Sequence, residues 1–308
     1  MKISFIATVL NEEKTIDRFL QSVNEQSVKP DEIVITDGGS SDRTIEKIKA
    51  FQKAHYVSFL LIQKNGNRSR GRNAAIEKAH GDIILCSDAG CTLDKDWAKN
   101  ISQPFVDKTV DVVAGYYKGV ATTLFQKCLI PYVLVMPDKV NPKNFLPATR
   151  SMAFRKKVWR DIGKFQEQFS HNEDYVFAKA LQKMHKKIVF AKQAIVYWYP
   201  PTNWKSSFIM FYRFAKGDAE ARIFRPKVIL LFLRYILSIL LLLSFILFHY
   251  YFMFYILCFA FLLYLIWSII KNYRYVKNLR ALYFLPLLQV LSDSAVISGT
   301  IRGFTTNR

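Results

Sequence analysis

The sequence has few cysteines, and their spacing shows no pairs. Its 308 residues contain only Cys86, Cys91, Cys128 and Cys258. Neither a disulfide framework nor a cysteine-based zinc site is therefore expected, which suits a reducing compartment. The first residues, MKISFIATVL, are too short and too lightly charged a run for a signal peptide. We expect them to form the first β-strand instead.

Charged residues almost disappear between Val228 and Ile270, where Phe, Tyr, Leu and Ile dominate. A helix crosses a bilayer core of roughly 30 Å with about 20 apolar residues. The stretch therefore suits two crossings, at about Val228–Phe248 and Tyr251–Ile270, joined by an aromatic turn. We predict that residues 228–308 form a membrane anchor and that residues 1–227 form a separate domain.

The rest of the predicted anchor is less apolar. Residues 271–280 are basic, and Ala281–Gly299 contains Pro286, Gln289 and Asp293. A carboxylate that faces lipid is costly. We therefore favour a helix at the membrane interface, or packed on the hairpin, over a third crossing, and both alternatives stay open at this point.

Acidic residues are outnumbered by basic residues, 24 to 44, which gives a net charge of +20. A basic surface attracts nucleic acid or anionic lipid. Because the same chain carries an apolar membrane segment, we expect membrane lipids as partners and no nucleic acid. Basic residues flank both sides of the predicted hairpin: Arg222, Arg225, Lys227, Lys271, Arg274, Lys277 and Arg280. By the positive-inside rule both flanks are cytoplasmic, which predicts a multi-pass protein of the cell membrane with a cytoplasmic N-terminal domain.

Strand and helix patterns alternate through the first two hundred residues. The expected strands are Ile3–Val9, Glu32–Thr36, Val57–Ile62, Asp82–Ser87, Val110–Ala114, Arg150–Arg155, Ile188–Ala191 and Ala194–Trp198. The expected helices are Thr15–Asn24, Thr44–Phe51, Asn73–Ala79, Asp96–Phe105 and Tyr175–His185, with a basic loop at Asn65–Arg70 and an interruption at Tyr116–Ala148. Such alternation predicts an α/β domain with a mostly parallel central sheet.

Polar clusters follow several of these strands, at Thr8–Glu13, Asp37–Asp42 and Asp88–Thr92. In open α/β sheets, ligands bind at the carboxyl ends of the strands. A carboxylate such as Glu12 can accept hydrogen bonds from ribose hydroxyls, and guanidinium groups at a helix start suit a diphosphate. Plainer interpretations also exist: helix caps at Asn11 and Asp42, a solvated basic loop before Arg72, and helix-start carboxylates at Glu173 and Asp174.

The order of these clusters resembles family 2 glycosyltransferases, the group that includes polyprenyl-phosphate sugar synthases. The resemblance covers roughly Lys2 to Trp198 and is carried by Asn11-Glu12-Glu13, Asp37-Gly38-Gly39-Ser40, Gly71-Arg72-Asn73, Ser87-Asp88, Gly163-Lys164-Phe165 and Glu173-Asp174. It implies a nucleotide-sugar-binding domain of the GT-A fold, followed here by C-terminal transmembrane helices.

The resemblance also implies a role for each matching residue. The nucleotide-sugar would be held by Thr8, Glu12, Asp37, Arg72, Asn73 and Asp88, with Asp37 reading the base. Asp88 would also bind a divalent cation, Mg²⁺ or Mn²⁺, since oxygen ligands suit these ions. Asp174 would be the general base that takes the proton of the acceptor hydroxyl. Arg150 and Glu173 are the candidate acceptor contacts.

Three departures from the family pattern qualify this interpretation. Gly90 stands where the family has the second Asp of Asp-x-Asp, so Asp88 would bind metal alone or with Asp94. Thr8 and Leu10 replace the usual Pro and aromatic residue. The Gln-x-x-Arg-Trp motif of processive members is missing near the membrane, which argues against a polymerising synthase.

The expected function is inverting transfer of a single sugar, from a UDP-linked donor to a lipid-linked or glycolipid acceptor, in glycan biosynthesis. A non-catalytic membrane-bound sensor of nucleotide-sugars is the first alternative, which Gly90 favours and Asp174 opposes. A sugar nucleotidyltransferase is the second. It ranks last because it needs a glycine-rich loop after the first strand, and Thr8–Glu13 contains no glycine.

Overall fold

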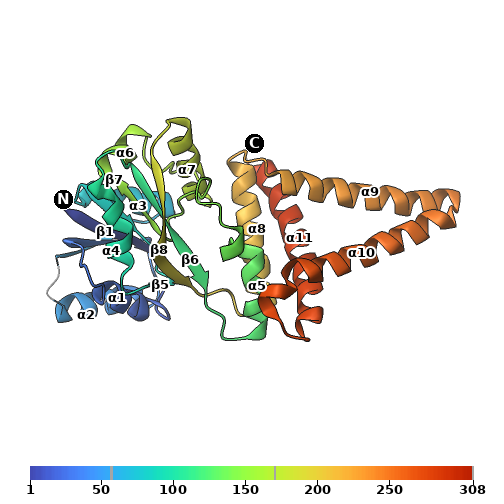
Figure 1. Ribbon diagram of the computed structural model, residues 1–308, viewed down its shortest axis with the longest axis horizontal. Coiled ribbons are helices and arrows are strands. Elements are labelled where there is room, and N and C mark those ends of the chain that lie inside the picture. The colour runs from blue at the N-terminus through green and yellow to red at the C-terminus, as the bar shows by residue number, and fades with distance from the viewer. Residues whose placement is uncertain (56–57, 170, 307–308) are drawn as a thin grey trace. The chain divides into compact units, whose positions relative to one another are not determined.

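The computed structural model describes residues 1–55, 58–169 and 171–306 of the chain (Figure 1). The chain divides into two compact units. The first comprises Met1–Val120 and Leu134–Tyr199, and the second comprises Ala121–Val133 and Pro200–Arg308. This division follows packing alone, and the functional boundary expected between residues 227 and 228 stays a prediction.

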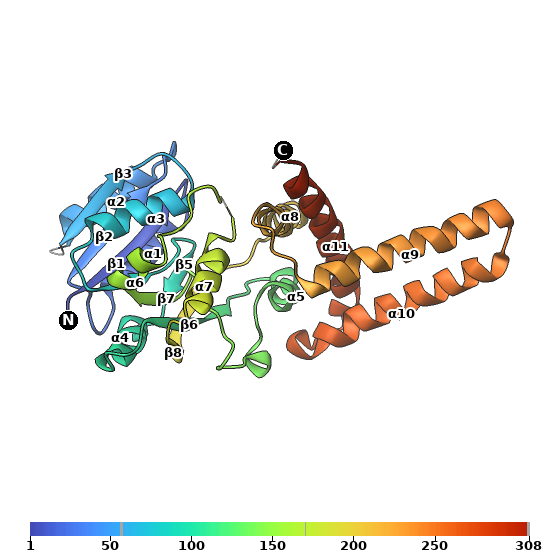
Figure 2. The ribbon, with the colours of Figure 1, turned by 90° about the horizontal axis from the view of Figure 1, so that it is seen from above.

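The first unit is built on one mixed sheet, visible in Figures 1 and 2. Its eight strands lie in the order β3-β2-β1-β4-β7-β6-β8-β5. Their bounds are β1 Ile3–Val9, β2 Glu32–Asp37, β3 Phe59–Gln63, β4 Ile83–Cys86, β5 Cys91–Leu93, β6 Val112–Gly119, β7 Met152–Arg155 and β8 Ile188–Trp198. Strands β3, β2, β1 and β4 are parallel, whereas β7 runs antiparallel between β4 and β6. The carboxyl ends of the parallel strands therefore meet at one edge.

Helices pack on both faces of this sheet. They are α1 Ile16–Asn24, α2 Thr44–Ala54, α3 Arg68–Lys78, α4 Trp97–Ser102, α6 Lys156–Asp161 and α7 Glu173–Lys183, with 3-10 helices at Gln103–Val106 and Pro137–Lys139. Side chains of β1 alternate between two cores: Phe5 packs with α1 and α4, and Ile6 packs with α3, α6 and α7. This alternation follows from the two-residue period of a strand. The sheet is thus buried on both sides, as parallel sheets require.

Several helices and strands differ in their bounds from those expected from the sequence. The basic loop expected at Asn65–Arg70 is wrong in its second half, because α3 already begins at Arg68, where the Asn67 side chain caps the helix by accepting from the Arg70 N–H. The two strands expected from Ile188 to Trp198 form the single strand β8, and β6 extends through Tyr116. Residue 57, at the start of one expected strand, lies outside the described residues.

The second unit is helical, with α5 Leu124–Val133, α8 Trp204–Glu220, α9 Pro226–Phe248, α10 Tyr251–Val276 and α11 Ala281–Thr306. Helices α9 and α10 form the expected hairpin (Figure 1). Within the described residues, three helices are long and apolar enough to cross a membrane: α9, α10 and α11. The basic stretch expected at 271–280 is helical through Val276, because α10 continues past the apolar run.

Candidate active site

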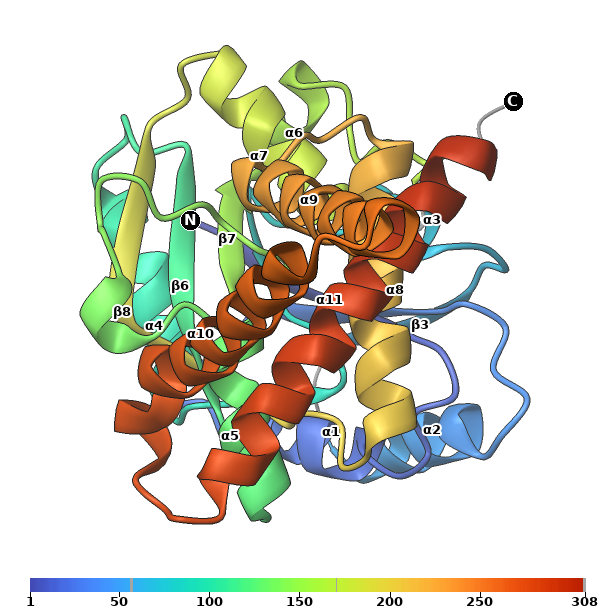
Figure 3. The same ribbon diagram turned by 90° about the vertical axis from the view of Figure 1, so that its right-hand side faces the viewer.

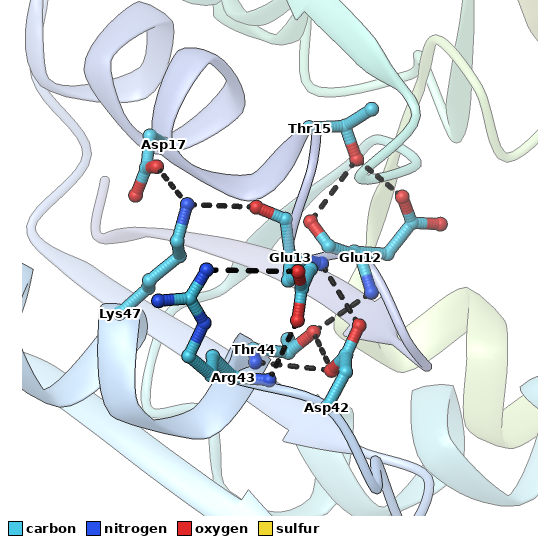
Figure 4. Close-up of polar contacts among 8 residues, drawn as sticks. All are labelled: Glu12, Glu13, Thr15, Asp17, Asp42, Arg43, Thr44 and Lys47. Carbon is cyan, nitrogen blue, oxygen red and sulfur yellow. Dashed lines mark hydrogen bonds and ion pairs between the residues drawn. The ribbon is translucent and has the colours of Figure 1, made fainter.

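The first two polar clusters are tied together at the carboxyl ends of β1 and β2, where Val9 pairs with Asp37. The Glu12 N–H donates to Thr44 Oγ1 at 2.7 Å and the Glu13 N–H donates to Asp42 Oδ2 at 3.1 Å. Figure 4 shows how these bonds join the two loops. Asn11 does not cap α1: its Oδ1 accepts from the Ser41 N–H at 2.9 Å. The helix-cap interpretation of Asn11 is therefore wrong, and these side chains join the two loops instead.

Asp37 is fully buried at the end of β2, and half of its carboxylate is used by the turn that follows. Its Oδ2 accepts from the Gly39 N–H at 2.9 Å and the Ser40 N–H at 3.0 Å. Its Oδ1 has no hydrogen-bond partner among the described residues. Gly39 adopts a left-handed φ of 104°, which favours glycine. The turn thus leaves one buried carboxylate oxygen without a partner among the described residues, and an unsatisfied buried acceptor is costly.

Arg72 joins the third, fourth and fifth clusters. Its side chain comes from α3, is only 2% exposed, and its Nη2 donates to Asp88 Oδ1 at 2.9 Å. Its Nη1 donates to Glu173 Oε1 at the start of α7. One guanidinium thereby links the carboxylate that follows β4 to the carboxylate that opens α7. The resemblance assigned Arg72 to the nucleotide, but its partners in this structure are these two carboxylates.

Asp174 follows Glu173 in the first turn of α7 and is partly buried. Its Oδ1 accepts from the Tyr175 N–H at 2.8 Å. Burial, and next the charge of Glu173, raise the pKa of Asp174 to about 6, against the lowering effect of Arg72. A carboxylate with a pKa near 6 is a stronger base than an ordinary aspartate.

Arg150 lies beside the same cluster. The Ser87 hydroxyl donates to the Arg150 carbonyl at 2.8 Å, which ties Arg150 to the residue before Asp88. Its guanidinium lies 5.2 Å from the Tyr117 ring centre and 5.1 Å from that of Trp198. Tyr117 and Trp198 were not predicted as site residues, because in sequence they are indistinguishable from ordinary strand aromatics.

Charges connect Glu12 to this cluster as well. Burial raises the pKa of Glu12, while Arg68 lowers it and Asp88 raises it. Burial also acts to raise the pKa of Asp88, but Arg72, Arg68 and Arg150 together hold it below its usual value. Asp88 therefore lies within electrostatic reach of Glu12, Arg150 and Asp174, and Asp174 lies within reach of Glu173 and Arg150 as well.

Thr8 and Asn73 have mainly structural surroundings. A Cβ on Gly71 would lie 2.8 Å from Thr8 Cγ2, so α3 packs closely on Thr8. The Asn73 Nδ2 donates to the Phe165 carbonyl at 2.8 Å and to Glu167 Oε1 at 3.0 Å. The Asn73 Oδ1 accepts from Trp159 Nε1 and the Phe165 N–H, both at 3.1 Å. These bonds fix the segment that leads to α7.

The donor set for a divalent cation is a single carboxylate. Across residues 1–55, 58–169 and 171–306, no three His, Cys, Asp or Glu side chains gather as metal ligands. Asp88 is 34% exposed and shares only Oδ1 with Arg72. Asp94 instead accepts from the Tyr197 hydroxyl at 3.0 Å. Because Mg²⁺ is commonly held by one or two carboxylates plus substrate phosphates, Asp88 fits as one ligand of an ion that a diphosphate completes.

Comparison with solved structures identifies the fold. The mannosyltransferase PcManGT from Pyrobaculum calidifontis, solved with GDP-Man and Mn²⁺, is 15% identical, with a TM-score of 0.60 over 100% of this chain and 88% of that chain. TarS from S. aureus in complex with UDP is 22% identical, with a TM-score of 0.51 over 70% of this chain and 64% of that chain. These similarities confirm the predicted GT-A fold with C-terminal apolar helices.

Curated relatives match over shorter stretches. Poly-β-1,6-N-acetyl-D-glucosamine synthase of Staphylococcus epidermidis is 34% identical over 94 residues, which is 30% of this chain and 23% of that protein. Glycosyltransferase GlyA of Streptococcus pneumoniae is 27% identical over 116 residues, which is 38% of this chain and 17% of that protein. The chain thus matches less than a quarter of the length of these two relatives.

Two family models cover most of the chain. The model for glycosyl transferase family group 2 matches residues 102–276. The model for glycosyl transferase family 2 matches residues 4–163, which contain the clusters around Glu12, Asp37, Arg72 and Asp88. The chain therefore belongs to glycosyl transferase family 2.

Proposed function

We propose that this protein transfers a single sugar from a UDP-linked sugar donor to a lipid-linked or glycolipid acceptor at the membrane. The transfer inverts the configuration at the anomeric carbon. The observation that carries this proposal is the Arg72 bridge. Arg72 holds Asp88, beside which the donor diphosphate binds, and Glu173, the neighbour of Asp174. Donor and base are thereby fixed to one buried guanidinium.

Asp37 supports a uridine nucleotide. Its unpartnered Oδ1 can accept the imide N–H of uracil, while its Oδ2 stays engaged in the turn. Glu12 accepts from the ribose hydroxyls. The S. aureus neighbour TarS was solved with UDP and with UDP-GlcNAc, which agrees with this assignment, whereas the Pyrobaculum calidifontis neighbour was solved with GDP-Man.

The donor assignment is tested by thermal stabilisation of the full chain with UDP, GDP and ADP. We expect UDP to stabilise it most and ADP least, because adenine lacks an imide N–H. In Asp37→Asn the amide oxygen can keep accepting from the Gly39 and Ser40 N–H groups. The amide N–H then faces the base and repels the imide N–H of uracil. The advantage of UDP should then vanish, with Asp42→Asn as the matched control. An unchanged preference in Asp37→Asn would remove Asp37 from the base site.

Each residue of the cluster then has its own role in the chemical step. The acceptor oxygen attacks the anomeric carbon opposite the diphosphate, the bond from that carbon to the diphosphate breaks, and the acceptor proton passes to Asp174. A single displacement of this kind inverts the configuration. Arg150, whose guanidinium lies beside the Tyr117 and Trp198 rings, contacts the acceptor, whereas Glu173, buried against Arg72, helps to position it through the neighbouring Asp174. A divalent cation held by Asp88, when bound, offsets negative charge on the departing diphosphate.

A membrane anchor with two crossings, α9 and α10, agrees with how α11 packs. In the apolar 18-residue stretch of α11, 39% is buried inside the structure, whereas 6% is buried in the corresponding stretches of α9 and α10. Helices α11 and α8 lie side by side (Figure 3). Gly299 and Gly303 of α11 lie directly against the backbone of α8, where a Cβ would come within 2.3 Å of the Tyr212 carbonyl oxygen and 2.5 Å of the Lys216 carbonyl oxygen. Helix α11 therefore cannot enter the bilayer without α8.

Helix α8 carries too many charges for the bilayer core. Its charged residues are Lys205, Arg213, Lys216, Asp218 and Glu220. Charged groups at the centre of a membrane cost about 3 kcal/mol each or more. Asp293 of α11 is itself paired with Arg234 and accepts from the Tyr264 hydroxyl at 2.7 Å. We therefore propose that α8 and α11 lie at the cytoplasmic interface.

Cysteine labelling tests this topology. In a Cys258→Ser background, which removes the exposed cysteine, Thr305→Cys should react with an impermeant reagent only from the cytoplasmic side. Tyr250→Cys, in the turn between α9 and α10, should react only from outside and is the matched control. External labelling at position 305 would mean three crossings.

A non-catalytic nucleotide-sugar sensor is the second candidate, because Gly90 leaves Asp88 as a lone carboxylate. Incubating the full chain with UDP-sugars separates the two functions. Release of UDP, with or without an added acceptor, supports the transferase. Stabilisation by UDP-sugars with no release under any acceptor condition supports the sensor.

A further inference from the structure

The second unit contains an apolar cavity that the proposed reaction does not use. Its volume is about 160 Å³, and it lies among α8, the first turn of α9, and the C-terminal half of α11. Its walls include Phe211, Ala215, Val228, Ile229, Val296 and Phe304. An apolar cavity of about 150 Å³ is known to stay dry and to take up benzene. This cavity therefore has room for roughly six carbon atoms of a hydrocarbon.

The rim of the cavity presents aromatic side chains to the surroundings. Phe224, which precedes α9, is 67% exposed, and Phe304 of α11 is 46% exposed. Their rings stack at 6.0 Å with an interplanar angle of 24°. Because α9 is a candidate membrane span that begins at Pro226, this rim lies where a crossing helix meets the membrane surface. Aromatic side chains favour that level of the bilayer.

Basic side chains outnumber acidic ones beside the polar end of the cavity. Arg225 donates to both carboxylate oxygens of Asp218, at 2.5 and 2.9 Å. Arg222 and Lys227 are exposed on the same connection between α8 and α9. Residues 213–227 contain five basic side chains and two acidic ones, Asp218 and Glu220. A basic surface next to a membrane helix attracts anionic headgroups.

We propose that this cavity binds an acyl chain of an anionic phospholipid of the bilayer, whose phosphate lies near Arg222 and Lys227. The proposal rests on the membrane placement of α9 proposed above. An apolar cavity joined to a basic rim matches a molecule with a hydrocarbon chain and a negative headgroup. Since the chain would touch α8, α9 and α11 together, its binding stabilises the folded anchor by mass action.

The test uses the full chain, purified in detergent, delipidated, and mixed with phosphatidylglycerol or phosphatidylcholine. Bound lipid is counted by native mass spectrometry. We expect phosphatidylglycerol to be retained and preferred by about fivefold for each basic side chain that faces its phosphate. The double variant Arg222→Gln with Lys227→Gln should lose this preference. Lys205→Gln, at the other end of α8, should keep it.

A cavity-filling variant tests the acyl chain. Val296→Phe occupies the cavity and should lower retention of phosphatidylglycerol at least about tenfold, because several buried CH₂ groups are lost. Ile301→Phe, on the exposed side of α11, is the matched control. If Val296→Phe does not fold, a phosphatidylglycerol with a diazirine on its acyl chain answers the question in the unaltered protein. Its crosslinks should concentrate at the cavity walls.

Three results would overturn the proposal: no retained lipid, equal retention of the two lipids, or crosslinks spread evenly along α9 and α10. Displacement of phosphatidylglycerol by equimolar polyprenyl phosphate would also overturn it, since the cavity would then belong to an acceptor lipid. Retention against polyprenyl phosphate supports it. No nucleotide-sugar is present in any arm, so a failure of the proposed sugar transfer would leave these results unchanged.

Discussion

Replacing Arg72 by Met removes the guanidinium that joins Asp88 to Glu173 while keeping much of the side-chain length. Glu173 is only 4% exposed, so its carboxylate would be left buried without its partner. Breaking a buried ion pair from one side typically costs about 3–5 kcal/mol. Asp88 is 34% exposed and regains water, so it adds less to the cost. The expected fall in melting temperature is roughly 6–20 °C for a unit of this size.

The double variant Arg72→Met with Glu173→Gln separates this cause from simple loss of packing. It removes both charges, so it should be more stable than Arg72→Met alone. The coupling is measured as a double-mutant cycle by thermal unfolding of the full chain in detergent. Arg160→Met, an exposed arginine on α6, is the control and should change little. Strict additivity of the two substitutions would refute the buried-bridge account.

Four further predictions concern pH and metal. Because only ionised Asp174 accepts a proton and its pKa is about 6, kcat/KM should fall as pH drops below about 6, and a flat profile from pH 5 to 7 would contradict this. A carboxyl pKa raised above the ordinary 3.8 means that the folded state binds the proton more tightly. Melting temperatures should therefore show that the unaltered chain loses stability as pH rises from about 4 to 7, relative to Asp174→Asn. Transfer should stop after EDTA treatment and return with Mn²⁺. Gly90→Asp should lower the Mn²⁺ concentration required, because it restores the second carboxylate of the Asp-x-Asp motif. The new side chain has room, since a Cβ at Gly90 meets no atom within 4 Å. Full activity after exhaustive EDTA treatment, or an unchanged Mn²⁺ requirement in Gly90→Asp, would argue against these assignments.

The parallel strands could be predicted from sequence because each is a short, continuous apolar run bounded by polar turns. β1 was predicted with its observed bounds, Ile3–Val9, and β2 differs by one residue. β5 was missed because three residues, Cys91–Leu93, show no periodicity. The start of α3 was misplaced because Arg68–Arg72 looks like a solvated loop. In the structure the Asn67 side chain caps the helix that begins at Arg68 by accepting from the Arg70 N–H.

The residues of the site were easier to name than their partners. The motif pattern identified Arg72, Asp88 and Glu173 separately, but their ion pairs join residues 16 and 101 positions apart in sequence. Such pairing depends on where α3 and α7 pack on the folded sheet. No local sequence pattern encodes these positions. Tyr117 and Trp198 were missed for the same reason, since they meet at Arg150 only through the register of β6 and β8.

The measurement that tests the central claim most directly is turnover by Asp174→Asn, with UDP affinity determined on the same sample. Loss of a general base lowers the rate by about 10²–10⁴, so turnover should fall by that factor while UDP affinity stays within a few-fold. Asp161→Asn, whose carboxylate pairs with Lys186 at 3.1 Å on the protein surface, is the control and should keep full activity. Near wild-type turnover in Asp174→Asn would contradict the assignment of Asp174 as the base.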